Sequence, residues 1–136
     1  MFDSVSGLIA RADDEAVDVE VSGFTMRVAV TAPTAAEFTE ARVARLLLRH
    51  KLESEAGQWR WFGFHREDER RAFDALATVK GVGRPTAMRI LSGIQPAELC
   101  RAAKDADVAA LRKVKGVGPK VAARIIESKE VRELQV

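Results

Sequence analysis

One short motif occurs twice in this chain of 136 residues, and the repeat constrains the fold more than any other feature. KGVGRPTAMRI begins at Lys80 and KGVGPKVAARI begins at Lys115. The glycines of the first copy, Gly81 and Gly83, recur in the second copy at a constant offset of 35 residues. A repeat of this kind indicates a duplicated structural unit.

Each copy is predicted to fold as a helix, a tight turn and a second helix. Apolar residues recur at helical spacing on both sides of each glycine pair, as in REDERRAFDALAT before the first. Two glycines around one small apolar residue suit a backbone that needs positive φ or a close approach to another molecule. The apolar residue between them, Val82 or Val117, is expected to anchor the turn in the core.

The start of the second helix in each copy is the predicted binding feature. Its first N–H groups have no partner within the helix and its dipole places partial positive charge there, so it can receive an anion. Glycines let a phosphate come close, and cations flank both turns, which predicts a clamp on the DNA backbone without base readout. The candidate residues are Lys80, Gly81, Val82, Gly83, Arg84, Lys115, Gly116, Val117, Gly118 and Lys120. The alternative is an ordinary helical hairpin whose glycines only make the turn, but duplication with cations at both turns favours phosphate binding.

Charge is distributed unevenly along the chain. Residues 1–64 hold seven Lys and Arg against ten Asp and Glu, a net charge of −3, whereas residues 65–136 hold fifteen against ten, a net charge of +5. A nucleic-acid surface is therefore expected in the C-terminal half. With one cysteine no intramolecular disulfide can form, and a cytoplasmic location is expected because neither a signal peptide nor a membrane-spanning run is visible.

The N-terminal half shows mainly the alternation of β-strands. Expected strands are DSVSGLIARA, broken at Gly7, then AVDVEV, FTMRVAV, RVARLLLRHKL and QWRWFGF, with a helical turn in TAAEFTEA. Five short strands predict a compact antiparallel barrel. The aromatic residues of the last strand are interpreted as core packing with a subunit contact, and base stacking is the alternative: Trp59, Trp61, Phe62 and Phe64.

The helical half offers no catalytic group. Asp68 or another early acid suits the positive end of its first helix, and the three arginines Arg66, Arg70 and Arg71 are interpreted as a solvated helix face. Cys100 is expected to be a small buried residue, because no histidine lies near it in the sequence. No metal-ligand cluster and no cofactor motif is visible, so none is expected.

The paired turns resemble the tandem helix-hairpin-helix motifs of the RuvA family, whose members bind four-way Holliday junctions in bacteria. LSGI at residues 91–94 and FGF at residues 62–64 agree with this family. The resemblance implies an α+β fold, with an OB-type β-barrel at residues 1–64 and a tandem helix-hairpin-helix domain at residues 65–136. It also implies a homotetramer assembled through the barrel.

The resemblance adds further site residues. Arg124 lies where the family carries a basic residue, and Arg89 is its counterpart in the first copy, so both are added to the expected DNA contacts. Glu53 and Glu55 approximately match the acidic pin that projects at the junction centre in the family, with plain surface charge as the alternative. Two departures are a pin hairpin longer by a residue and the order Arg84-Pro85 where Pro then Lys is usual.

The function expected is non-catalytic, structure-selective binding of four-way junction DNA in recombination and repair. The resemblance also implies a third domain that contacts a RuvB-type motor, but none is recognised in the sequence given, so such a motor is not expected to dock by the usual C-terminal domain. One alternative is a general, non-sequence-specific DNA-binding module or an accessory subunit of a nuclease or helicase, although no P-loop or carboxylate cluster is visible. The other is a protein-interaction scaffold that has lost DNA binding.

Overall fold

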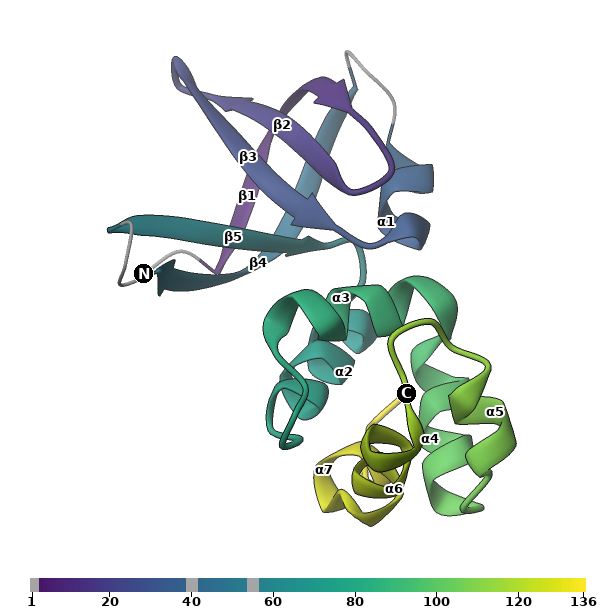
Figure 1. The fold of residues 1–136 in the computed structure, drawn as a ribbon. Helices are drawn as coiled ribbons and strands as arrows, with labels where there is room; N and C mark the ends of the chain where they lie inside the picture. Colours follow the sequence, from purple (N-terminus) through teal and green to yellow (C-terminus); the bar gives the residue numbers. More distant parts are fainter. Residues whose placement is uncertain (1–2, 39–41, 54–56) are drawn as a thin grey trace. The chain divides into compact units, whose positions relative to one another are not determined.

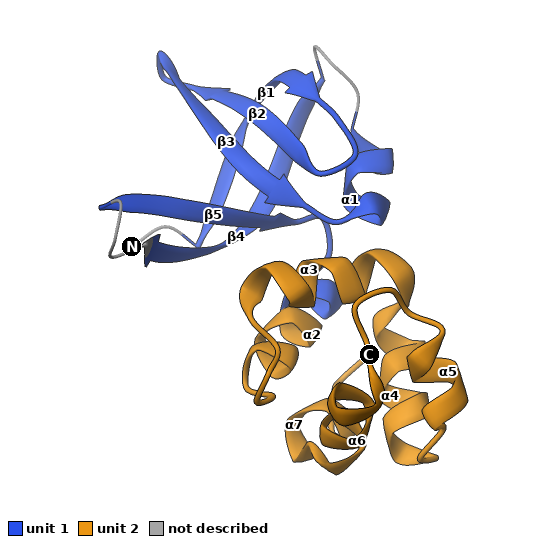
Figure 2. Cartoon of the chain, viewed as in Figure 1, with its two compact units in different colours: residues 1–70 blue, residues 71–136 orange. Residues whose placement is uncertain are grey.

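The computed structural model describes residues 3–38, 42–53 and 57–136. The chain divides into two compact units, residues 1–70 and 71–136 (Figure 2). The division falls inside helix α2 (Glu67–Ala77), whereas the sequence-based division placed this helix wholly in the second part.

The first unit contains a closed β-barrel (Figure 1). Its strands are β1 (Ser4–Ala12), β2 (Ala16–Val21), β3 (Phe24–Val30), β4 (Val43–Glu53) and β5 (Gln58–Phe64), with helix α1 (Ala32–Glu37) between β3 and β4. The strand order is β1-β2-β3-β5-β4, closed by the pairing of β4 with β1. The predicted OB-type barrel is confirmed, with the refinement that β3 and β5 pair in parallel while the other pairs are antiparallel.

The predicted break in the first strand is wrong. β1 continues through Gly7, which pairs with Ala44 of β4. A side chain at position 7 would collide with the carbonyl oxygen of Glu20 on the neighbouring strand. Glycine here permits close approach of two strands and does not end one.

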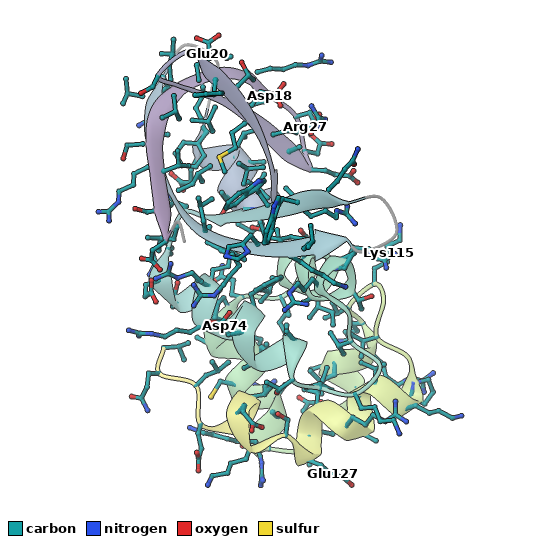
Figure 3. All side chains as sticks on the ribbon, turned by 90° about the vertical axis from the view of Figure 1, so that its left-hand side faces the viewer. Asp18, Glu20, Arg27, Asp74, Lys115 and Glu127 are labelled. Carbon is teal, nitrogen blue, oxygen red and sulfur yellow. The ribbon has the colours of Figure 1, made fainter. Side chains whose placement is uncertain are left out.

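Alternation along the strands sorts side chains between the barrel core and the surface. On β2, Val17 and Val19 are buried, while Asp18 lies opposite Arg27 of β3. Arg27 Nη1 donates to Asp18 Oδ1 at 3.2 Å, and Figure 3 shows the two side chains together on the barrel surface. An exposed cross-strand pair of opposite charge adds less than about 1 kcal/mol, so the buried valines set the register.

A buried carboxylate joins α1 to the first turn of α2. Glu69 is 6% exposed and accepts hydrogen bonds from Thr31 Oγ1 at 2.9 Å and from Thr34 Oγ1 at 2.8 Å. Thr34 Oγ1 in turn accepts from the His65 N–H at 3.2 Å. Burial raises the pKa of Glu69, and the two hydroxyl donors partly oppose that rise.

The arginines at the start of α2 differ in role. Arg70, predicted to be solvated, is 7% exposed: Nη1 donates to Asp3 Oδ1 at 2.9 Å and Nη2 to Glu67 Oε2 at 2.7 Å. That prediction is wrong because Arg70 is enclosed within the first unit, where its charge needs partners. Arg66 is exposed and pairs with Asp68, which lies in the first turn of α2 as expected for an early acid.

The second unit is helical. It comprises the rest of α2, then α3 (Arg84–Gly93), α4 (Pro96–Lys104), α5 (Val108–Arg112), α6 (Pro119–Glu127) and α7 (Lys129–Arg132). Helix α4 contacts α5, α6 and α7, and its Leu99 is fully buried. Across the described parts of the chain, none of the helices has the length and apolar character needed to cross a membrane.

Replacing Glu69 with Ala should destabilise the first unit. The change leaves two buried threonine hydroxyls without their shared acceptor, which costs about 2 kcal/mol. Urea unfolding measures the effect, and Asp14→Ala, at an exposed barrel position, is the matched control with an expected change below about 0.5 kcal/mol. Equal losses for the two variants would contradict a structural role for the Glu69 network.

Candidate nucleic-acid interface

The two glycine turns are built in the same way. In the first, the Val82 N–H donates to the Val79 carbonyl at 3.0 Å; in the second, the Val117 N–H donates to the Val114 carbonyl at 3.1 Å. Val82 and Val117 are 5% and 6% exposed, as predicted for residues that anchor a turn. The sequence repeat therefore corresponds to a repeat in hydrogen bonding and burial.

The two glycines of each pair have different backbone conformations. Gly81 and Gly116 have φ of +89° and +96°, a conformation that other residues rarely adopt. Gly83 and Gly118 have φ of −80° and −89° with extended backbone, and each is the N-cap of the following helix. The expectation of positive φ is therefore right only for the first glycine of each pair.

Helices α3 and α6 both begin without a capping side chain. Neither Gly83 nor Gly118 has a side chain that could accept from the helix that follows it. The first N–H groups of both helices are therefore open to an acceptor from outside the protein. In α6 proline is the first residue, whereas in α3 proline is second, after Arg84. Because proline has no N–H, the available donors are the amides of residues 83, 84 and 86 at the start of α3 and of residues 118, 120 and 121 at the start of α6.

Cationic side chains surround both helix starts. Lys80, Lys115, Lys120 and Arg89 are exposed, and Arg84 is half-buried. Figure 3 shows Lys115 projecting from the turn before α6. Exposed cations beside uncapped helix N-termini form an arrangement that attracts phosphate through both charge and N–H donors.

Arg124 differs from the other predicted contacts. It is half-buried, and its Nη1 donates to the carbonyl oxygen of Lys80 at 3.1 Å. Its counterpart Arg89 instead donates from Nη2 to Thr86 Oγ1 within its own helix, at 3.3 Å. A contact between α6 and the first turn was not foreseen, because the repeat pattern assigns both arginines the same role.

Other predicted groups lie elsewhere or outside the described residues. Glu55 and the side chain of Glu53 lie outside the described residues, so the acidic pin stays a prediction.

Phe62 and Phe64 are buried, whereas Trp59 is 51% exposed. Cys100 is buried as expected, with Sγ 3.4 Å from the Arg132 carbonyl oxygen. Within the described ranges, no three His, Cys, Asp or Glu side chains gather as a metal site requires.

Comparison with known proteins agrees with this geometry. Residues 73–128 match the family model described as a SAM-like helix-hairpin-helix tandem. The chain is 36% identical over 126 residues to the Holliday junction branch migration complex subunit RuvA of Wolinella succinogenes, covering 93% of this chain and 65% of that protein. It is 34% identical over 114 residues to the RuvA of Treponema pallidum, covering 84% of this chain and 50% of that protein.

The chain belongs to the RuvA family. A third RuvA, from an Anaeromyxobacter strain, is 51% identical over 70 residues, which cover 51% of this chain and 36% of that protein. The chain thus spans between about half and two thirds of the length of the first two RuvA proteins. The tandem that matches the family model contains both turns.

Replacing Gly116 with Ala should destabilise the helical unit by about 1–2 kcal/mol, because alanine is strained at positive φ. Gly118→Ala is the matched control, two residues away, where the backbone is extended and a new methyl group meets no protein atom within 4 Å. The control should change the free energy of unfolding by less than about 0.5 kcal/mol. Equal losses would show that positive φ is not what requires glycine at 116.

Proposed function

We propose that the paired turns bind the sugar-phosphate backbone of DNA and that the preferred target is a four-way junction. The observation that carries the proposal is the repeated uncapped helix N-terminus, at Gly83 and Gly118, with cations beside each. Two such sites on one helical unit can grip a duplex without reading its bases. The binding is non-catalytic and serves recombination and repair.

The proposed preference for a junction is supported by the relatives of this chain. The RuvA proteins that match this chain are named as subunits of a Holliday junction branch migration complex. Phosphate contacts alone do not distinguish a junction from a linear duplex, so selectivity requires several copies held in a fixed arrangement.

A homotetramer is the assembly that we propose. The barrel exposes large apolar side chains that a monomer would leave in water: Leu8, Phe24, Val43, Leu52 and Trp59. Leu52 and Trp59 are cross-strand neighbours on β4 and β5, which places two of these side chains together. Exposed apolar side chains that lie together are typical of protein interaction sites, so the pair of Leu52 and Trp59 supports assembly through the barrel.

Binding to a four-way junction should be about 100-fold tighter than to a linear duplex of equal length, because four copies each engage one arm. A gel-shift titration of both DNAs measures this ratio, and the mass of the protein in solution reports the number of copies. Equal affinity for the two DNAs would reduce the proposed function to general DNA binding. Cleavage of the junction with Mg²⁺ would instead indicate an enzyme.

Reversing one cation at each turn, Arg84→Glu with Lys120→Glu, should abolish measurable binding at moderate salt. Neutralising the same two positions, Arg84→Gln with Lys120→Gln, should make the fall of log affinity with log salt shallower by about 2. Each phosphate contact that is lost contributes about 0.9 to this slope. The control for the reversal is Arg11→Glu with Arg45→Glu, which makes the same change in net charge at exposed barrel positions. If this control is as damaging as the turn variant, total charge and not the turns governs binding.

A further inference from the structure

The guanidinium of Arg124 reaches from α6 to the first turn. Its Nη1 lies 3.1 Å from the carbonyl oxygen of Lys80, which is 44 residues earlier in the chain. Lys80 directly precedes Gly81, the residue with φ of +89°. A side chain from the second hairpin therefore holds the backbone of the first turn at the point where the chain reverses.

The same guanidinium also occupies the space beside Gly81. A Cβ built at position 81 would lie 2.8 Å from Arg124 Nη1, whereas a Cβ at the equivalent Gly116 meets no atom within 4 Å. Gly81 is thus required for its backbone conformation, and a Cβ at this position would also displace the end of the Arg124 side chain. The second turn has only the first of these two constraints.

The equivalent arginine makes no such contact. Arg89 is exposed, and its Nη2 donates to Thr86 Oγ1 on its own helix. Two arginines at matching positions of the repeat therefore have different surroundings. Arg89 is available to a phosphate, while Arg124 has a hydrogen-bond donor committed to the protein backbone.

The hollow beside Arg124 is lined by side chains of both charges. Arg124 and Lys80 line a hollow of about 210 Å³ together with two carboxylates, Glu127 and Glu130. Figure 3 labels Glu127 at the last turn of α6. The two carboxylates offset the positive charges of Arg124 and Lys80 in this hollow.

We propose that Arg124 is a positioning residue that locks the first turn to α6, so that the two phosphate-binding turns are held as one rigid pair. It acts through the hydrogen bond from its Nη1 to the carbonyl oxygen of Lys80. This inference rests on the proposed function for its consequence in DNA binding. The contact that it invokes lies within the protein and can be tested without DNA.

The test uses Arg124→Lys, which keeps the positive charge but has a shorter side chain and no planar guanidinium to reach the carbonyl. The amide of Val82 reports closure of the first turn and the amide of Val117 reports closure of the second. Hydrogen exchange at Val82 should become about ten-fold faster in the variant, with Val117 unchanged, because one charge-assisted hydrogen bond is lost. The DNA-free protein is used for this measurement.

DNA affinity is the second readout. Arg124→Lys should weaken junction binding by about ten-fold despite the unchanged charge. This loss should match the fold-increase in hydrogen exchange at Val82, because both reflect opening of the first turn. Arg112→Lys is the control, the same substitution at an exposed arginine in the last turn of α5 that is assigned no DNA contact. It should leave both exchange rates unchanged and affinity within about two-fold.

Unchanged exchange at Val82 in Arg124→Lys overturns the positioning role. Faster exchange with full DNA affinity overturns the claim that the lock serves binding. If the unsubstituted chain fails to bind any DNA, the proposed function fails, and the exchange measurement still decides whether Arg124 holds the turn.

Discussion

The helical unit depends on a backbone reversal that only glycine adopts easily. Positive φ at Gly81 and Gly116 turns the chain so that the next residue, a valine, packs into the core and closes the turn with a hydrogen bond. The following helix then begins without a capping side chain. Packing inside the protein and open amides outside it are thus consequences of one local conformation.

Features that arise from local pattern could be predicted from the sequence. The bounds of β2, β3 and β5 follow the alternation of apolar and polar residues, and the burial of Val82 and Val117 follows from the repeat. These predictions succeed because strand alternation and turn chemistry depend on residues close together in the chain. The OB-type strand order was expected only from the family resemblance.

Features that depend on distant partners could not be predicted. Arg70 looks like part of a solvated helix face, yet its partner Asp3 is 67 residues away; Arg124 bonds to a carbonyl 44 residues away. The signal for Glu69 is equally weak, since an acid near a helix start is common and its threonine donors lie 35 and 38 residues earlier. A polar side chain shows in the sequence what it can bind but not which group the fold brings to it.

The prolines at the two helix starts make the two copies of the repeat unequal. Proline is the first residue of α6 but the second of α3, so the missing N–H falls directly after the N-cap in one copy and one residue later in the other. An oxygen atom that accepts from the remaining amides would therefore lie differently at each helix start. The two halves are therefore not interchangeable: rotating one hairpin onto the other would not reproduce the same set of hydrogen bonds, and a bound strand would encounter a distinct head and tail.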